Sequence, residues 1–165
     1  MTKKMNQLHP RVARSIAGVS DVVIHDHAAL GQAIRSPQDF SDAIGVPLDR
    51  ITKSLFLRSK TGAGHAVVVL GMNHKLDFAA ASEAAGVGRL EVGKPEELAE
   101  VLGYPRNGVS PLGIPGEVPV LIDAELHNFP TILIGGGATG IEIEIAPDTL
   151  AHLTGAVVVS LSALP

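Results

Sequence analysis

Short connections between predicted strands limit most strongly what this chain can fold into. Residues 51–57 and 65–70 are apolar stretches of strand length, and only a short run with Gly62 and Gly64 separates them. A parallel pair needs a crossover of roughly a dozen or more residues, whereas a short turn joins antiparallel strands. The two stretches are therefore predicted to form an antiparallel hairpin. Further strands are predicted at residues 21–25, 90–92, 118–122, 131–134, 141–145 and 156–161.

Short helices are predicted between these strands from their start and stop signals. Ser36-Pro37-Gln38-Asp39 offers an N-cap serine, a proline in the first turn and an acidic side chain, and Gly45 ends the helix. Similar signals predict helices at residues 6–18, 77–85, 95–102 and 147–154. Strands outnumber helices, which predicts an α+β domain with a mixed, largely antiparallel sheet flanked by short helices. No linker marks a second unit, so residues 1–165 are predicted to form a single domain.

Composition excludes several classes of protein. The chain has no cysteine, so it offers no disulfide framework and no thiolate ligand or nucleophile. Aromatic residues make up 3% of the chain, so the core must be aliphatic. The first residues lack the apolar segment of a secretory signal, and no apolar run reaches the roughly 20 residues that span a bilayer. We therefore expect a cytoplasmic protein without a membrane contact. A net charge of −4 argues against a general nucleic-acid coat, but not against a site that holds only a nucleic-acid end.

Residues 103–116 form a loop that is too rich in glycine and proline for a helix or a strand. It is also longer than most connections, which run about 2–6 residues. Its prolines stiffen the chain, and its glycines allow backbone N–H groups to approach a ligand closely. Two interpretations remain open: an ordinary surface loop, or a shaped loop that binds an anion or a carbonyl group.

Lys53 is an unusual residue within the strand predicted at residues 51–57. Side chains alternate between the two faces of a strand, so Lys53 shares a face with Ile51, Leu55 and Leu57. A lysine on an aliphatic face is costly unless it has a partner or borders a cavity. Either Lys53 extends from an edge into water, or the face with Thr52, Ser54 and Phe56 is the inner one. The third interpretation is a cation in a pocket that can receive a phosphate, a carboxylate or an ester carbonyl.

Several motifs together resemble the YbaK/prolyl-tRNA synthetase editing-domain family. The resemblance covers about residues 20–162, and its order and spacing are fairly specific. No catalytic or anticodon-binding part of a synthetase is recognised, so a freestanding member is expected. The motifs are Lys53 in Ile-Thr-Lys-Ser-Leu, Gly71, Lys75-Leu76-Asp77, Gly103-Tyr104 with Gly108-Val109-Ser110-Pro111, Asp123, and Gly136-Gly137 before Ile141-Glu142.

This resemblance implies a barrel-like sheet and a trans-editing hydrolase that removes a wrongly attached small amino acid from tRNA. The expected partner is the 3′ acceptor end of an aminoacyl-tRNA, with an aminoacyl-tRNA synthetase as a second expected partner. Lys53 matches the family's essential lysine, and Gly108 matches the glycine of the loop that frames the aminoacyl pocket. Glu142 stands where some members carry another acidic residue, and Gly135 where some carry serine. The substrate-binding candidates are Val109, Ser110, Pro111, Gly135, Gly136 and Glu142.

Aminoacyl esters are already activated, so such a site needs no protein nucleophile and no cofactor. Backbone N–H groups at residues 108–110 are candidates for stabilising the oxyanion. Four cations, Arg58, Lys60, Lys75 and Arg106, are candidates for a rim facing the acceptor stem, with scattered solvated charges as the alternative for each.

Weaker signals leave alternatives open. The spacing of His25 and His27 suits a zinc site, but no further ligand cluster accompanies it, so no metal is predicted. Glu142 and Glu144 lie on the polar face of their strand. Each is either a residue of the site or simply exposed to solvent. The alternative to an enzyme is a non-catalytic module of the same fold that binds an aminoacyl group or a nucleotide and docks on a synthetase or a charged tRNA.

Overall fold

The structure is a computed structural model that describes residues 5–163. Its strands form two sheets, one of three strands in the order β1-β7-β6 and one of five in the order β4-β2-β3-β5-β8. The first contains β1 (Val23–Asp26), β6 (Ile132–Gly135) and β7 (Ile141–Ile145). The second contains β2 (Thr52–Ser59), β3 (His65–Gly71), β4 (Leu90–Val92), β5 (Val120–Asp123) and β8 (Val157–Val159).

Most neighbouring strands are antiparallel, which confirms the predicted α+β class. The β2–β3 pair is the predicted hairpin, with Lys53 opposite Leu70. The β2–β4, β1–β7 and β6–β7 pairs are also antiparallel, whereas β5 pairs in parallel with β3 and with β8.

The two sheets meet where β2 begins beside β6. Ile51 and Leu133 form a parallel bridge, and the Thr52 hydroxyl donates to the Leu133 carbonyl at 2.7 Å. The strands do not close on themselves, so the barrel-like description implied by the resemblance is only a loose one. The join brings the start of β2 next to the end of β6, and this corner holds the cavity described below.

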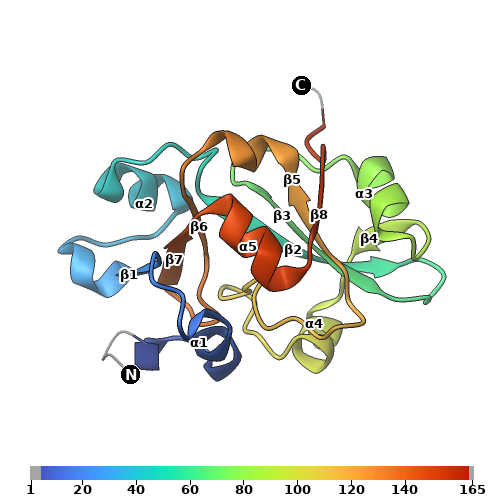
Figure 1. The fold of residues 1–165 in the computed structure, drawn as a ribbon, viewed down its shortest axis with the longest axis horizontal. Helices are drawn as coiled ribbons and strands as arrows, with labels where there is room; N and C mark the ends of the chain where they lie inside the picture. The colour runs from blue at the N-terminus through green and yellow to red at the C-terminus, as the bar shows by residue number, and fades with distance from the viewer. Residues whose placement is uncertain (1–4, 164–165) are drawn as a thin grey trace.

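In the described part of the chain, five α-helices lie around the sheets: α1 (Pro10–Ile16), α2 (Pro37–Ile44), α3 (Phe78–Ala85), α4 (Pro95–Val101) and α5 (Pro147–Thr154). Residues 5–163 also contain three short 3-10 helices, η1 (Met5–Gln7), η2 (His27–Leu30) and η3 (Ala124–Asn128). Along the longest axis α2 lies near one end and α3 near the other, with α5 across the middle (Figure 1). No helix in residues 5–163 is both long and apolar enough to cross a membrane.

The predicted helix ends follow from local capping. The side chains of Ser36 and Asp77 accept hydrogen bonds from the first turns of α2 and α3, and Gly45 and Gly86 end these helices in the left-handed conformation.

The prediction of one helix over residues 6–18 is wrong. His9 is extended (φ −59°, ψ 140°) and serves as the N-cap of α1, so η1 and α1 are separate. The cause is Pro10, because a residue before proline disfavours the helical conformation.

The core is aliphatic, as the composition predicted. One cluster lies between the three-stranded sheet, α1, α5 and the inner face of β3, and includes Val67, Ile122, Ile143 and Leu150. A second cluster lies beneath α3 on the other face of β3.

Candidate functional site

A cavity of about 670 Å³ opens at the corner where the two sheets meet. The start of β2, the loop of residues 103–116, the turn of residues 135–142 and the segment from the end of β1 to α2 all contribute to its wall. Of the predicted site residues, Lys53, Val109, Gly135 and Glu142 line it, and so does Arg106. The sequence therefore identified residues from three separate segments that the fold brings together.

Lys53 lies half-buried on the wall of this cavity, next to Thr52 and Ser54. Burial lowers the pKa of Lys53 from its usual value, because leaving water disfavours the charged ammonium. Among residues 5–163 its side chain has no hydrogen-bond or ion-pair partner. The Ser54 hydroxyl is likewise buried without a partner in the described part of the chain. This wall therefore offers a partly exposed cation to a ligand, next to a buried hydroxyl group without a partner among residues 5–163.

Two glycine-rich segments pack backbone against backbone to form another part of the wall, which includes Val109 and Gly135. A Cβ atom on Gly135 would lie 2.1 Å from the Val109 carbonyl oxygen, and one on Gly108 would lie 2.8 Å from the Ala138 carbonyl carbon. Neither glycine has a positive φ. Glycine is therefore needed at both positions because the two backbone segments approach each other closely, and not because the backbone is left-handed there.

The loop of residues 103–116 is held in one shape by buried hydrogen bonds. The Ser110 hydroxyl accepts from the Leu112 N–H at 3.1 Å, and the Tyr104 hydroxyl donates to the Leu112 carbonyl. Ser110 and Pro111 are buried and do not line the cavity, and the same is true of Gly136. These three residues support the wall of the cavity and are not part of its surface.

The backbone donors of this loop differ in availability. The Gly108 N–H donates to the Pro105 carbonyl at 2.9 Å and is already engaged. The N–H groups of Val109 and Ser110 have no partner among residues 5–163. Val109 lines the cavity and has an unengaged backbone donor, and among residues 5–163 the same is true of Arg106 and Asn107.

Glu142 and Glu144 are not simply exposed to solvent. Glu142 accepts from the His27 imidazole, Nε2 to Oε2, at 2.6 Å, and Glu144 bonds the His25 Nε2 at 3.0 Å. The His25–Glu144 pair links β1 to β7, and the His27–Glu142 pair links η2, which follows β1, to β7. His27 and Glu142 line the cavity, whereas His25 and Glu144 do not. The two histidines therefore bind two separate carboxylates, and within residues 5–163 neither belongs to a group of three or more His and carboxylate side chains close enough to share an ion.

The two carboxyl groups also differ in acidity. Burial raises the pKa of Glu142, and the hydrogen bond from His27 only partly opposes this effect. A hydrogen bond from Thr131 lowers the pKa of Glu144, and His25 and Arg50 act in the same direction.

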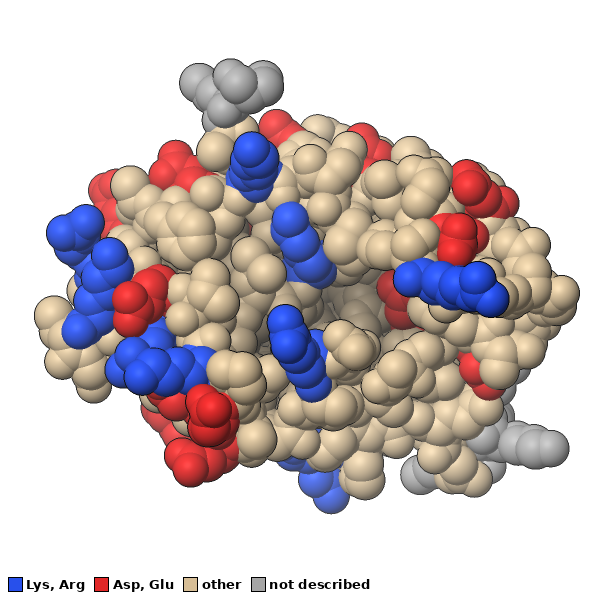
Figure 2. Space-filling model, turned by 180° about the vertical axis from the view of Figure 1, so that it is seen from behind, with Lys and Arg blue, Asp and Glu red and all other residues tan. Residues whose placement is uncertain are grey.

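The basic rim differs from the predicted one. Arg106 and Arg35, both exposed, line the cavity beside Lys53, and sequence reasoning missed Arg35. Basic side chains lie on several sides of a hollow near the centre of one face (Figure 2).

The other predicted rim cations lie away from this cavity. Arg58 is near the far end of β2 and pairs with Glu91 at 3.3 Å and with Glu97 at 3.1 Å. Lys60 and Lys75 are exposed and do not line the cavity.

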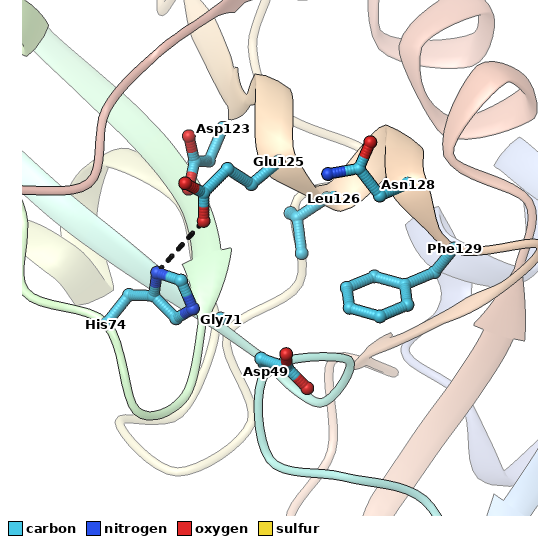
Figure 3. Close-up of a pocket in the computed structure, with 8 residues that line it drawn as sticks. All are labelled: Asp49, Gly71, His74, Asp123, Glu125, Leu126, Asn128 and Phe129. Carbon is cyan, nitrogen blue, oxygen red and sulfur yellow. Dashed lines mark ion pairs between the residues drawn. The ribbon is translucent and has the colours of Figure 1, made fainter.

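A second, smaller cavity of about 90 Å³ lies near His74, Asp123 and Glu125 (Figure 3). Within residues 5–163 these three side chains are the one His and carboxylate group close enough to hold a metal ion. However, Asp123 already accepts from the Leu161 N–H and the Ser162 hydroxyl, and His74 bonds Ser162 at 2.9 Å. The group thus fastens the C-terminal segment to the ends of β3 and β5.

Comparisons with known proteins relate this chain to aminoacyl-tRNA editing proteins. Residues 32–153 match the family model described as aminoacyl-tRNA editing domain. EbsC of Enterococcus faecalis, whose name gives it as a candidate Cys-tRNA(Pro)/Cys-tRNA(Cys) deacylase, is 30% identical over 120 residues, 72% of each chain. The prolyl-tRNA editing protein ProX of Acetoanaerobium sticklandii is 31% identical over 83 residues, 48% of this chain and 51% of ProX.

A solved structure supports the same relationship over the whole chain. The crystal structure of a protein described as a candidate trans-editing enzyme for prolyl tRNA synthetase has a TM-score of 0.80 and 25% identity, and the match covers 99% of both chains. Because the family model matches well over half of the residues, the chain belongs to the aminoacyl-tRNA editing domain family.

Proposed function

We propose that the 670 Å³ cavity is the site where this editing domain hydrolyses the ester bond between a small, wrongly attached amino acid and the 3′ end of a tRNA, acting in trans. Family membership supports deacylation as the activity. The observation that carries the assignment to this cavity is Lys53, a half-buried cation without an intramolecular partner among residues 5–163.

In this proposal Lys53 binds the terminal nucleotide near the ester. A partly buried ammonium gains more from an anionic or strongly polar partner than an exposed one does, because water screens it less. The terminal phosphate and the ribose hydroxyl beside the ester both offer such oxygens. Lys53 would thereby fix the position of the ester carbonyl relative to the loop, which is the orientation effect that lowers the barrier for an already activated ester.

The loop of residues 103–116 would stabilise the negative charge that develops on the carbonyl oxygen. Val109, which lines the cavity, supplies an unengaged N–H group for this role, whereas the Gly108 N–H bonds Pro105 and Ser110 is buried away from the cavity surface. A well-placed backbone donor of this kind contributes about 100- to 1,000-fold in rate in other acyl-transfer sites. Gly108 has a different role here, which is to allow the loop to approach the backbone of Ala138.

The dimensions of the cavity favour a small amino acid. Its volume must hold part of the terminal adenosine as well as the aminoacyl group, and pockets for small ligands commonly span about 300–1,000 Å³. The apolar part of the wall, formed by Ile34, Phe40, Ile51 and Met72, would exclude larger side chains by size, as in double-sieve editing.

The expected partner is the acceptor end of a charged tRNA. Arg35 and Arg106 on the cavity wall are exposed cations that suit phosphates of the terminal nucleotides. A synthetase is the second proposed partner, supported by the likeness to a structure described as a trans-editing enzyme for prolyl tRNA synthetase.

A deacylation panel tests this proposal. tRNA charged with proline, alanine, cysteine, serine or threonine is incubated with the wild type, with Lys53→Met and with Lys60→Met. We expect rapid loss of one small amino acid and a decrease in kcat/KM of at least about 100-fold in Lys53→Met, as for the loss of a key transition-state contact.

Lys60→Met is the matched control, because Lys60 is an exposed lysine in the same hairpin that does not line the cavity. It should retain wild-type kinetics. If no ester is lost faster than in buffer, or if both substitutions act alike, the proposed site is wrong. Binding of charged tRNA without hydrolysis would instead indicate a non-catalytic module.

A further inference from the structure

The cavity contains two acidic side chains, and only one of them has an oxygen free to bind a substrate. Asp26 accepts from the Gln7 amide at 2.8 Å and, as N-cap of η2, from the Ala28 N–H at 3.0 Å, so both of its oxygens are engaged. Glu142 uses Oε2 for His27, while Oε1 has no partner among residues 5–163. The Glu142 Oε1 atom is therefore the available negative oxygen among the side chains that line the cavity.

His27 holds this carboxylate in place. Its ring lies tilted against Phe40, with 4.7 Å between ring centroids, and its backbone N–H donates to the Gly140 carbonyl at 2.9 Å. The backbone of His27 is thus held by Gly140 and its imidazole by Phe40, and the ring reaches Glu142 Oε2 at 2.6 Å. With Oε2 held by His27, Oε1 remains the oxygen that can meet a ligand.

No hydrogen bond or ion pair joins Lys53 to Glu142, although both line the same cavity. The cavity therefore keeps a positive and a negative group apart. An aminoacyl ester has the matching polarity: oxygens around the ester and phosphate, and an α-amino group on the next carbon that is protonated near and below neutral pH. Burial of Glu142 without a cation is unfavourable, so a bound ammonium group would offset this cost.

We propose that Glu142 Oε1 binds the α-ammonium group of the substrate and that His27 is the positioning residue for Glu142. This inference rests on the proposed function and extends it to a substrate class, namely esters whose α-amino group is free. Esters with a blocked amino group, such as N-acetyl-aminoacyl-tRNA and by the same chemistry peptidyl-tRNA, lack the positive charge and are poor substrates.

The test compares the panel ester that the wild type hydrolyses fastest with its N-acetyl derivative on the same tRNA. For the wild type, we expect kcat/KM to be about 10- to 100-fold higher for the free amine, the range for one hydrogen bond to a charged group. In Glu142→Gln this ratio should fall toward the ratio of the two rates of hydrolysis in buffer, because the amide keeps the shape of the side chain but not its charge.

His27 is tested by two substitutions. His27→Ala removes the donor to Oε2 and should lower the ratio of the two kcat/KM values, whereas His27→Gln retains a side-chain donor and should restore part of it. A purely structural role of His27 would lower both rates together and leave the ratio unchanged. Circular dichroism and thermal melting confirm that each variant is folded.

The neighbouring pair on the same strands supplies the control. His25 and Glu144 form the same kind of contact at 3.0 Å but do not line the cavity. His25→Ala and Glu144→Gln should leave the ratio at its wild-type value, although they lower stability.

Equal kcat/KM for the free and the blocked ester in the wild type would overturn the inference, as would an unchanged ratio in Glu142→Gln. Either result would leave the deacylase assignment intact. Absence of hydrolysis for every free ester would instead overturn the proposed function itself, so the two failures are distinguishable.

Discussion

Gly135 lies so close to the loop of residues 103–116 that a methyl group has no room there. A Cβ atom at this position would be 2.1 Å from the Val109 carbonyl oxygen, and both atoms belong to segments fixed by the backbone. Serine, which the resemblance suggests for some relatives, carries the same Cβ atom. In this chain the loop therefore lies closer to the end of β6 than a serine-bearing site would allow.

The substitution Gly135→Ala should consequently be disruptive. We expect a decrease of about 1–3 kcal/mol in the free energy of unfolding, the range for overpacking, since the loop must move away from β6. Because Val109 lines the cavity, kcat/KM for deacylation should also fall. Gly116→Ala is the control: no atom lies within 4 Å of its Cβ position and its φ is not positive, so denaturant unfolding should show little change. Similar stability of both variants would contradict the close packing.

At the scale of elements, β7 places two glutamates in opposite environments. Glu144 accepts from the Thr131 hydroxyl at 2.7 Å and pairs with Arg50 and His25, so its charged form is stabilised. Glu142 lies on the cavity wall, where burial raises its pKa. The Glu144 carboxylate therefore stabilises the contact between neighbouring strands. The Glu142 carboxylate lies on the cavity wall, where its burial lowers the stability of the fold.

Glu144→Gln should lower the free energy of unfolding at neutral pH by roughly 1–3 kcal/mol, the range for hydrogen bonds to charged groups. Because the folded pKa of Glu144 is lowered, its contribution is complete above the ordinary glutamate pKa and disappears as the pH falls through the folded value. Denaturant titrations of both proteins should therefore converge in acid. A constant difference across this pH range would contradict the role of its charge.

Glu142→Gln should have the opposite effect. The folded state binds the Glu142 proton more tightly than the unfolded state does, so the ionised group destabilises the fold above its raised pKa. The amide cannot ionise, and the variant should be more stable than the wild type at pH 8 and no more stable well below the ordinary glutamate pKa. Lower stability of the variant at pH 8 would show that the His27 hydrogen bond outweighs burial.

The sequence predicted the helix ends and the unusual position of Lys53 well, because the causes of both are local. Ser36, Asp77 and Gly86 act within one helical turn, and Lys53 stood out from its own strand pattern. The assembled site depends on long-range contacts instead. His27 and Glu142 bond each other although they are 115 positions apart in the sequence. Arg58 was predicted to lie on the basic rim, but in the fold it pairs with Glu97. Sequence spacing alone holds no information on which of several cations faces a cavity.

At the scale of the whole molecule, helix α1 supports the site from outside the residues matched by the family model, 32–153. Arg11 donates to the carbonyls of Leu102 and Gly113, close to the two ends of the loop of residues 103–116. Its guanidinium carbon also lies 4.9 Å from the centre of the buried Tyr104 ring. One side chain thus connects an N-terminal helix to both ends of the loop that forms a wall of the cavity.

Arg11→Met should therefore loosen the loop without removing any group from the cavity. Methionine retains apolar packing but loses both hydrogen bonds and the cation–π contact, which together contribute on the order of 1–3 kcal/mol. Amide hydrogen exchange in residues 103–116 should become faster, and kcat/KM for deacylation should fall because Val109 is less fixed. Arg14→Met is the matched control, since Arg14 is exposed on the same helix and its side chain has no bonded partner among residues 5–163. Equal exchange rates in both variants would show that the loop keeps its shape without α1.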